Sequence, residues 1–418
     1  MTGIRYHQGK LHSDGVPLAA LGEGLGTPLY VYSADAILER YGRLEKAFAR
    51  LEPGIRYAVK ANSNRAILRL LRHRGAGFDL VSGGELERAL QAGGDPSNFV
   101  FAGVGKQDWE IQKALHAQVG IFNIESEGEI DRIEFHAQKT GRKTQVALRL
   151  NPDVDARTHE YISTGKEENK FGIPLSQASP LVDRIHRSAQ LELVSYHVHL
   201  GSLLLDPGPF LEAAGRVMAF MDADEAHRRG VRTYDTGGGF GIRGNFEEPL
   251  ALDELAEGFE ELLLPRGLRL LLEPGRYLVG NAGCLLTRVL ERKQRKTKDF
   301  LIVDASMSEL IRPALYDAVH EIVPLREGLE PLEKPVDVVG PVCESADFLG
   351  KDRKLPALER GAFLAVLTAG AYGFSMASRY NTRTLPAEVL TRGDHALLIR
   401  RRETLEHIFQ NEVEEEWK

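Results

Sequence analysis

Short apolar runs alternate with amphipathic helical patterns through the first two thirds of this chain. The runs are rich in isoleucine, valine, phenylalanine and leucine and stop at glycine or polar residues, which is typical of buried strands. We predict eight strands, at Ile55–Lys60, Phe78–Ser82, Phe99–Ala102, Ile121–Ile124, Val146–Asn151, Val194–His199, Thr233–Thr236 and Leu270–Glu273. Helical spacing predicts helices at Ala34–Leu51, Glu85–Ala92, Glu110–Gln118, Glu129–Gln138, Pro180–Ser188, Pro209–Arg229 and Leu252–Leu264.

This alternation predicts an α/β fold in which residues 29–284 form a (β/α)8 barrel of the TIM type. A doubly wound open sheet is the competing architecture, but it usually has fewer strands. After residue 284 the rhythm stops, and strand-like runs such as Leu301–Asp304 and Val336–Val339 follow between Gly-Pro pairs. Residues 285–418 are therefore predicted to form a β-rich second domain.

The start of the chain is assigned to the same second domain. Residues 1–27 show short strand patterns and glycine-rich turns, without a helix of consequence. They precede the barrel strands and have no partner there. We therefore predict that residues 1–28 and 285–418 together make the β-rich domain.

Composition narrows the class of protein. The chain has 418 residues, 43% of them hydrophobic and 27% charged, which is typical of a globular protein. A net charge of -7 gives no sign of a nucleic-acid or membrane-surface partner. Cys284 and Cys343 are too few for a disulfide framework or a cysteine-based zinc site. Since no signal core or membrane-spanning apolar run is present, we expect a cytoplasmic protein.

Four polar stretches fall at the ends of predicted strands. Lys60 ends the first strand, His197–Ser202 the sixth, Asp235–Gly241 the seventh and Glu273–Arg276 the eighth. Because the active site of such a barrel lies at the carboxyl ends of its strands, we expect these stretches to meet at one rim. The triple glycine at 237–239 can turn sharply and aim backbone N–H groups at an anion, most often a phosphate.

A lysine that can form a Schiff base, a phosphate cradle and a strand-end carboxylate together indicate pyridoxal phosphate. In this interpretation Lys60 binds the cofactor aldehyde, and Glu273 keeps the pyridine nitrogen protonated. His199 would stack on the pyridine ring, and Ser202 would bond to the phosphate. Each residue also has an ordinary structural alternative. Lys60 could be a solvated loop lysine and Glu273 a partner for Arg276 alone. His199 could be a buried barrel histidine and Ser202 a helix cap.

His197 and His199 support a rival hypothesis. Two residues apart on a strand, they face the same way. With Lys60 they could bind a metal ion for a hydrolase. No further aspartate–histidine set closes the other strands, and the triple glycine would then have no role, so we favour the cofactor.

Further motifs extend this pattern over nearly the whole chain. In the barrel they are Tyr57-Ala-Val-Lys-Ala-Asn, Arg149-Leu-Asn-Pro-Asp-Val-Asp, Thr158-His-x-Tyr-Ile-Ser-Thr-Gly, Asn169-Lys-Phe-Gly-Ile, His197-x-His-x-Gly-Ser, Gly237-Gly-Gly-Phe-Gly and Glu273-Pro-Gly-Arg. In the second domain they are Val303-Asp-Ala-x-Met, Ile311-Arg-Pro-Ala-Leu-Tyr, Gly340-Pro-Val-Cys-Glu-Ser-x-Asp and Gly370-Ala-Tyr-Gly-x-x-Met-Ala-Ser-x-Tyr-Asn. Through these motifs the chain resembles the diaminopimelate decarboxylases. They belong to the alanine-racemase-like pyridoxal phosphate enzymes, together with the ornithine and arginine decarboxylases.

The resemblance implies roles for individual residues. Lys60 and Cys343 would be catalytic, with Cys343 as the proton donor. Cofactor contacts are expected from Lys60, His199, Ser202, Gly238, Gly239, Glu273, Gly275, Arg276 and Tyr372. Substrate contacts are expected from Arg276, Arg312, Tyr316, Glu344 and Tyr372.

The implied activity is decarboxylation of meso-2,6-diaminopimelate to L-lysine and CO2, the last step of bacterial lysine biosynthesis. The far end of this substrate is a second amino-acid head, which needs a cation for its carboxylate and an anion for its ammonium. Arg276 and Arg312 can bind that carboxylate, with a hydrogen bond from Tyr316, and Glu344 can meet the ammonium. A decarboxylase of another basic amino acid and a non-catalytic cofactor-binding regulator remain as alternatives.

The resemblance also implies a homodimer. In the family, the active sites lie at the dimer interface. The segment around Cys343 would then come from the other subunit, so that the dimer would be the smallest active unit.

Overall fold

The computed structural model describes residues 3–155, 170–242 and 250–414. The motif predicted from Thr158 to Gly165 lies outside these residues. The chain divides into two compact units. Among the described residues, one unit, here called the barrel unit, contains 38–155, 170–242 and 250–278, and the other, here called the β unit, contains 3–37 and 279–414.

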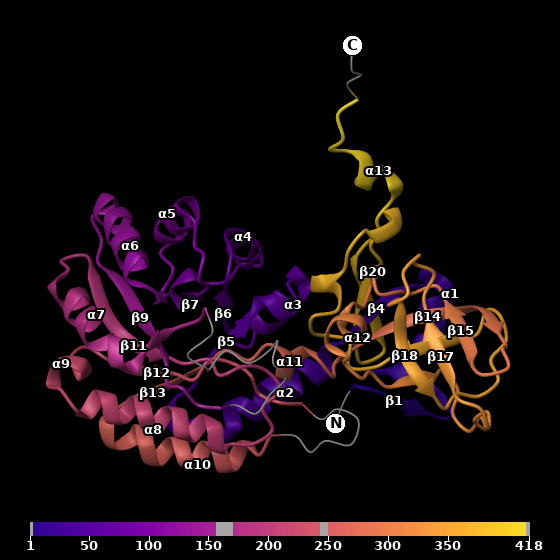
Figure 1. Ribbon diagram of the computed structural model, residues 1–418, viewed down its shortest axis with the longest axis horizontal. Coiled ribbons are helices and arrows are strands. Elements are labelled where there is room, and N and C mark those ends of the chain that lie inside the picture. The colour runs from indigo at the N-terminus through magenta and orange to yellow at the C-terminus, as the bar shows by residue number, and fades with distance from the viewer. Residues whose placement is uncertain (1–2, 156–169, 243–249, 415–418) are drawn as a thin grey trace. The chain divides into compact units, whose positions relative to one another are not determined.

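Eight parallel strands close into a barrel in the barrel unit (Figure 1). They are β5 (Gly54–Ala58), β6 (Gly77–Leu80), β7 (Phe99–Phe101), β8 (Ile121–Ile124), β9 (Thr144–Asn151), β11 (Leu191–His197), β12 (Thr233–Asp235) and β13 (Arg269–Leu272). The circle closes because β8 pairs with β9 and β13 pairs with β5, while the short β10 (Ile173–Pro174) adds to β9. The predicted barrel is confirmed, and the open sheet is excluded.

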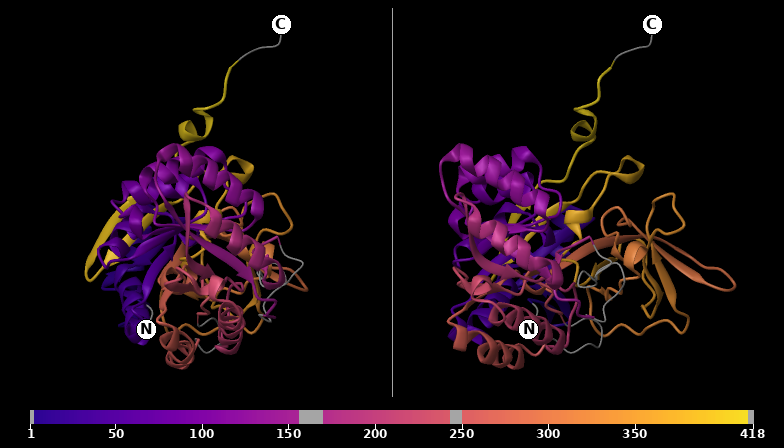
Figure 2. Two further views of the ribbon diagram at one scale, coloured as in Figure 1. Left: turned by 90° about the vertical axis from the view of Figure 1, so that its left-hand side faces the viewer. Right: turned by 60° about the vertical axis from the view of Figure 1, so that its left-hand side comes forward.

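Helices of the barrel unit lie outside its strands (Figure 1 and Figure 2). They include α2 (Ala34–Ala47), which lies in this unit from residue 38 on, and α3 (Arg65–Arg72), α4 (Gly83–Gln91), α5 (Asp108–Ala117), α6 (Glu127–Thr140), α7 (Leu175–Arg187), α8 (Gly208–Asp222), α9 (Glu225–Arg228) and α10 (Leu252–Leu263). Ser82 and Ser126 begin α4 and α6 as N-caps, each accepting the N–H of a glutamate three residues on. These caps let α4 and α6 begin only a few residues after β6 and β8, so the loops at these two strand ends are short.

One of the predicted helices is divided into two helices in the structure. The expected helix Pro209–Arg229 ends at Asp222, and a second begins at Glu225. The reason is Asp224, whose side chain accepts the N–H of Ala226 and so caps a new helix. The helical periodicity of the sequence continues across this break and did not reveal it.

Apolar and polar residues occupy different levels of the barrel interior. Val100, Ile121, Ala147, Val194 and Leu271 pack together as an apolar cluster. Asn123, Arg149 and Glu273 each follow a member of this cluster by two positions, so they point to the same side of the sheet, nearer its carboxyl end. All three are buried. The barrel therefore presents a buried polar layer on top of an apolar one.

The β unit is built around the long strand β14 (Gly283–Lys293). Its main sheet runs in the order β18 (Phe348–Arg353), β17 (Val336–Val339), β15 (Asp299–Val303), β14, β4 (Leu29–Ser33), β20 (Ala387–Arg392) and β21 (His395–Arg400). The strands β16 (Ile322–Pro324) and β19 (Phe363–Val366) pair with each other, and β19 also pairs with β14. The predicted β-rich character of this region is confirmed.

The boundaries between the units differ from those we predicted. β4 pairs with β14 and β20 in the β unit, so residues 29–37 belong there and not with the barrel. Residues 279–284 also belong to the β unit. The short strands β1 (Ile4–His7), β2 (Lys10–Ser13) and β3 (Val16–Pro17) form a sheet of their own. Sequence alone could not show this, because β4 has the same apolar pattern as a barrel strand.

The expectation that residues 1–27 lack a helix of consequence is wrong. Leu18–Leu25 form the helix α1, which buries Leu18 and Leu21 against the core of the β unit. Three glycines in and after this segment hid the helix in the sequence. Gly22 has a packing reason, since a Cβ there would lie 2.8 Å from the ring of Phe363.

No helix in the described ranges combines the length and the apolar character that crossing a membrane requires.

Candidate active site

Lys60 lies on a short turn directly after β5, at the carboxyl end of the barrel. The turn covers Val59–Ala61, so the strand ends two residues before the lysine. The Lys60 ammonium donates a hydrogen bond to the carboxylate of Asp79, which stands opposite Ala58 on β6. The Lys60 side chain is 33% exposed, whereas that of Asp79 is fully buried. The lysine nitrogen is thus held at a defined point at the barrel end, on a side chain that is partly exposed.

Asp79 is a buried acid with a raised pKa. Burial raises the pKa of its carboxyl above the usual range, the charge of Glu273 raises it further, and the Lys60 ammonium lowers it. Its second oxygen, Oδ1, has no hydrogen-bond partner among the described residues. The ammonium of Lys60 is therefore the contact that offsets the cost of burying this carboxylate.

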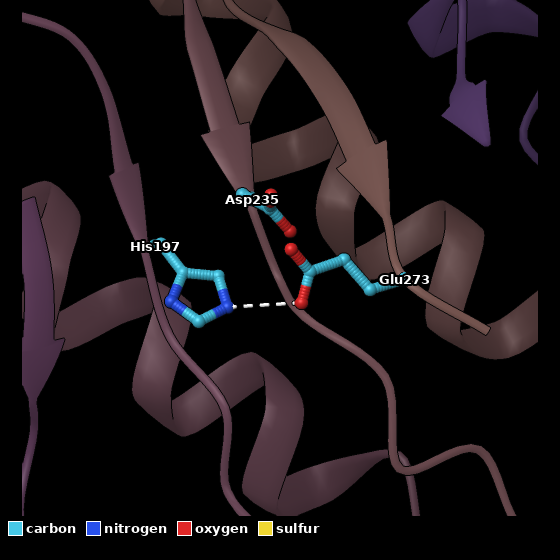
Figure 3. A group of neighbouring side chains, drawn as sticks. All are labelled: His197, Asp235 and Glu273. Carbon is cyan, nitrogen blue, oxygen red and sulfur yellow. Dashed lines mark hydrogen bonds and ion pairs between the residues drawn. The ribbon is translucent and has the colours of Figure 1, made fainter. Parts of the chain in front are cut away.

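His197, Asp235 and Glu273 meet inside the barrel end (Figure 3). His197 ends β11 and Asp235 ends β12 in register with it, and Glu273 directly follows β13. Nε2 of His197 lies 3.1 Å from Oε2 of Glu273, at hydrogen-bond distance. In the part of the chain that the structure describes, Oε1 of Glu273 and Nδ1 of His197 have no partner.

The contacts within this cluster set the charge of each group. Burial by itself raises the pKa of Glu273, but the charges of His197 and Lys60 outweigh it and lower the value to about 2. Burial lowers the pKa of His197, and Glu273 raises it to a net value above the ordinary one. Burial and the charge of Glu273 raise the pKa of Asp235 to about 8. Near neutral pH, Glu273 is therefore anionic and Asp235 is largely protonated.

Asp235 gives the protein a pH-dependent stability. An aspartate in the unfolded chain titrates at about 3.9. Between that value and about 8, the folded protein holds a proton that the unfolded chain has lost. The contribution of Asp235 to the free energy of unfolding therefore falls as the pH rises through this window.

The variant Asp235→Asn should remove this contribution, because an amide does not titrate and its oxygen can still accept the N–H of Gly237. We expect its urea midpoint to depend less on pH than that of the wild type between about pH 5 and pH 8. Asp183→Asn, on the exposed face of α7, serves as the control. Parallel pH curves for wild type and Asp235→Asn would contradict this assignment.

Gly237, Gly238 and Gly239 form a tight turn after β12. Gly237 and Gly239 have φ angles of 67° and 94°, in the region that favours glycine. A Cβ on Gly238 would lie 2.4 Å from the carbonyl oxygen of Glu273, and one on Gly239 would lie 2.5 Å from that of Gly201. The backbone of the turn therefore packs directly on the loops after β13 and β11.

His199 packs against this glycine turn. The N–H of Gly238 donates to Nδ1 of His199 at 3.1 Å, so this nitrogen is the unprotonated one. Burial and the positive charges of Arg149 and Lys60 hold the pKa of His199 well below its usual range. The ring is thus neutral and offers a flat aromatic surface, as stacking on a pyridine requires.

Gly238 allows a direct test of the turn. The variant Gly238→Ala should lower the free energy of unfolding by about 1–3 kcal/mol, because the new Cβ meets backbone that cannot move freely. It should also weaken cofactor binding, since the turn and Glu273 must shift apart. Thermal unfolding and a cofactor titration measure both effects. Gly128→Ala is the matched control, because a Cβ there meets open space on α6. Equal cofactor affinity in wild type and Gly238→Ala would argue against a binding role for the turn.

Ser202 and Arg276 meet beside the glycine turn. Nε of Arg276 lies 3.3 Å from Oγ of Ser202. Arg276 begins the short helix α11 (Arg276–Val279). Gly275, just before it, allows the loop after β13 to approach the Lys60 turn, because a Cβ there would lie 3.0 Å from Cβ of Ala61. A hydroxyl and a guanidinium are thus placed together at the strand ends.

These barrel residues fit pyridoxal phosphate. Lys60 supplies an amine for an aldehyde, and the partnerless Oε1 of Glu273 is a buried anionic acceptor suited to a protonated pyridine nitrogen. The glycine turn, Ser202 and Arg276 offer backbone N–H groups, a hydroxyl and a positive charge for a phosphate. The chemistry of the donors therefore agrees with that of the cofactor.

The remaining predicted site residues belong to the β unit. Arg312 and Tyr316 stand at the two ends of α12 (Arg312–Tyr316), with the guanidinium carbon 6.0 Å from the centre of the tyrosine ring. Cys343 and Glu344 are exposed on the loop between β17 and β18. Tyr372 has a φ of 55°. Such an angle is unusual for a bulky residue, and such residues concentrate at functional sites.

Two residues of the barrel end escaped the sequence analysis as functional candidates. Asp79 was treated only as part of a strand, and Asp235 only as part of the glycine motif. The sequence did contain a signal for them, because each is a carboxylate within an apolar strand, and a buried acid needs a partner. His197 was considered only as a metal ligand.

The metal hypothesis grouped His197 and His199 with Lys60. The described residues instead gather His197 with Asp235 and Glu273, with ligand atoms within 4.8 Å of one another. His199 accepts a hydrogen bond from the glycine turn, and Lys60 contacts Asp79. The three residues of that hypothesis therefore have separate partners.

Comparison with known proteins agrees with this chemistry. The family model described as "Pyridoxal-dependent decarboxylase, pyridoxal binding domain" matches residues 34–280. This span contains all eight barrel strands and the residues grouped around Lys60, His197 and Glu273.

Similarity extends beyond the barrel to the full chain. Diaminopimelate decarboxylase of Neisseria meningitidis serogroup A is 48% identical over 404 residues, which cover 96% of this chain and 99% of that protein. The enzyme of the same name from Pseudomonas aeruginosa is 45% identical over 412 residues, 99% of both chains. The crystal structure of diaminopimelate decarboxylase from Helicobacter pylori complexed with L-lysine matches with a TM-score of 0.90 at 42% identity, covering 94% of this chain and 98% of that one. This chain therefore belongs to the diaminopimelate decarboxylases, a family of pyridoxal phosphate-dependent enzymes.

Proposed function

We propose that this protein uses pyridoxal phosphate to decarboxylate meso-2,6-diaminopimelate to L-lysine and CO2, the last step of bacterial lysine biosynthesis. The observation that carries the proposal is the buried Glu273 carboxylate. One of its oxygens is held by His197 and the other has no partner among the described residues, at the barrel end where Lys60 also lies. The resemblance of the whole chain to diaminopimelate decarboxylases supports the choice of substrate.

In this proposal the barrel residues bind and orient. Lys60 would hold the cofactor through its amine, the nucleophile that an aldehyde requires. Glu273, kept anionic by His197, accepts a hydrogen bond from the protonated pyridine nitrogen. His199 offers its neutral ring for stacking. When bound, pyridoxal phosphate supplies the electron sink that takes up the electron pair left on Cα as CO2 departs.

The phosphate would be held by groups that the barrel end brings together. Gly239 would offer its backbone N–H, in a turn that Gly238 packs against the loop after β13, and Ser202 and Arg276 would add a hydroxyl and a positive charge. Gly275 contributes by letting the loops approach closely. These contacts fix the cofactor independently of the reacting carbon.

Residues of the β unit would complete the reaction. The bond between Cα and the carboxylate at the D-configured centre breaks, and Cys343 gives the proton of its thiol to that carbon. Tyr372 is proposed to contact both cofactor and substrate. Its left-handed backbone at φ 55° supports a functional role, because such strain is retained where geometry matters.

Selection of the substrate would depend on its far end. Arg276 and Arg312 provide guanidinium groups that can bind a second carboxylate in a fork, with Tyr316 adding a hydrogen bond. Glu344 is exposed and can meet the second ammonium group. Lysine and ornithine have an ammonium group but no carboxylate at this end. They would therefore give the two guanidinium groups no second carboxylate to bind.

The decisive experiment supplies the purified protein with pyridoxal phosphate and one amino acid at a time. We expect CO2 release and lysine formation from meso-diaminopimelate, and little from ornithine, arginine or lysine. Faster turnover of one of those three would replace the proposal with a decarboxylase of another basic amino acid. Cofactor binding without turnover of any of them would favour a non-catalytic regulator.

We further propose a homodimer with shared active sites. Support comes from the edge strand β21, which pairs only with β20 within the described part of the sheet. Apolar side chains on and after β21 are exposed, including Leu397 at 61% and Leu405 at 56%. Edge strands and apolar patches of this kind are usually covered by a partner.

Sedimentation of the purified protein tests the dimer. We expect the mass of two chains for the wild type and of one chain for the double variant Leu397→Lys/Leu398→Lys. Phe135→Lys, which alters an exposed apolar residue on α6 of the barrel unit, should remain dimeric. A monomeric, fully active wild type would refute shared sites.

A further inference from the structure

The loop that carries Cys343 is held in one shape by buried contacts. It spans residues 340–347, between β17 and β18. Cys343 and Glu344 are exposed at its tip, whereas Val342 and Asp347 are buried. The loop therefore presents a thiol and a carboxylate outward from an anchored base.

Asp347 anchors the loop through both of its carboxylate oxygens. Oδ1 accepts the N–H of Met307 and Oδ2 accepts the N–H of Val342, each at 2.7 Å. The residue is only 5% exposed. Since an ionised aspartate is an acceptor at both oxygens, it can satisfy two backbone N–H groups at once. The first half of the loop is thereby tied to the segment after β15.

Gly340, at the start of the loop, packs directly on Asp347. A Cβ on Gly340 would lie 2.5 Å from Oδ2 of Asp347 and 2.6 Å from Cα of Ser306. The backbone N–H of Asp347 donates to the carbonyl oxygen of Glu344 at 3.1 Å. The loop is therefore closed on itself as well as anchored to its neighbours.

Asn381 holds the loop at its tip, next to the thiol. Its Oδ1 accepts the backbone N–H of Cys343 at 2.8 Å. The φ angle of Asn381 is 54°, in the left-handed region where asparagine is among the few tolerated residues. This side-chain contact joins the Cys343 loop to a segment 38 residues further along the chain.

We propose that Asp347 and Asn381 are positioning residues that hold the Cys343 thiol in place for proton transfer. Both contact the backbone at or beside Cys343, and they act through it. The inference rests on the proposed function, in which Cys343 returns a proton to Cα. A proton donor must be held within a fraction of an ångström to act efficiently, and a loop fixed at both sides meets that need.

The variant Asp347→Asn tests the anchor with almost no change in shape. One oxygen becomes an N–H2 group that faces a backbone N–H, so one anchor bond is lost. We expect kcat for meso-diaminopimelate to fall by roughly 10- to 100-fold, while KM and cofactor affinity stay within about twofold. Asp352→Asn, an exposed aspartate on β18, is the matched control and should behave as wild type.

The variant Asn381→Gly tests the second contact. Glycine keeps the left-handed backbone but removes the acceptor oxygen. Because Asn381 is exposed, its replacement should leave the fold intact. We expect kcat to fall by about 3- to 10-fold with unchanged KM. Asn381→Asp retains an acceptor oxygen and should restore most of the loss.

The configuration of the product separates positioning from a merely structural role. Decarboxylation in D2O places one deuterium on Cε of the lysine formed. A fixed acid delivers it to one face, so the wild type should give a single configuration. Asp347→Asn and Asn381→Gly should give a mixture of both, whereas partial unfolding would lower the yield and leave the configuration pure.

Each outcome has a definite meaning. A wild type without turnover of meso-diaminopimelate would refute the proposed function and not the loop contacts. An active wild type, with both variants retaining kcat or a single deuterium configuration, would overturn the inference. If Asp347→Asn unfolds, seen as thiol labelling of the otherwise buried Cys284, the result for Asn381→Gly alone decides.

Discussion

Replacing Lys60 by alanine should abolish turnover and cofactor attachment together. The amine that binds the aldehyde is lost, and with it the lysine charge that helps to lower the pKa of Glu273. We expect a decrease in kcat of at least about 1000-fold, as for removal of a covalent catalytic group. The visible absorbance of the lysine-bound cofactor should disappear in the same variant, and spectra recorded before and after dialysis measure this directly.

The same variant should also lower stability, because Asp79 then loses its ammonium partner inside the barrel. We expect a loss of about 1–3 kcal/mol in the free energy of unfolding. Lys60→Arg separates the two effects. It keeps a cation near Asp79, but a guanidinium does not condense with an aldehyde, so stability should recover while activity should not. If either variant turned over substrate as fast as the wild type, Lys60 would have no part in the mechanism.

Replacing Cys343 by alanine should leave the cofactor bound and reduce turnover severely. Loss of a general acid typically costs about 100- to 10,000-fold in rate. Because Cys343 lies in the β unit and outside the group of barrel residues described above, the absorbance of bound cofactor should be unchanged. Turnover of meso-diaminopimelate and a spectrum of the same sample measure the two quantities.

The two cysteines provide a built-in check on this variant. Cys343 is exposed, whereas Cys284 is buried, and burial raises the pKa of its thiol to about 12. A thiol reagent at neutral pH should therefore label the folded wild type at Cys343, and Cys343→Ala should remain unlabelled. Ser345→Ala, beside it on the same exposed loop, is the control for activity. Unchanged turnover in Cys343→Ala would assign the proton to another acid.

The barrel could be predicted because its signals are local. Each strand is a short apolar run followed by a polar or glycine residue, and the eight runs recur at intervals that helices fill. The rim position of Lys60, His199 and Glu273 follows from the same pattern, because parallel strands end on one side. The glycine turn and the pair of Ser202 and Arg276 also lie at the carboxyl ends of the strands, as expected for a barrel of parallel strands.

Other features depended on contacts between distant residues and could not be predicted. β4 has the pattern of a barrel strand, yet it pairs with β14 and β20, which lie about 250 and 360 residues further on in the sequence. The helix α1 is rich in glycine and is held by packing against the β unit rather than by propensity. The placement of such elements depends on the residues they pack or pair with, and local periodicity does not identify those residues.

The chemistry divides along the same line. The sequence by itself determined the fold class and the family, and it supplied the residues that we propose as the amine, carboxylate, imidazole and thiol of the reaction. Only the tertiary structure decided that His197 bonds to Glu273, that Lys60 bonds to Asp79, and that Asp235 keeps its proton near neutral pH. The physical reason is that the sequence specifies the type of each side chain, whereas its charge and orientation depend on neighbours that folding brings within hydrogen-bond distance.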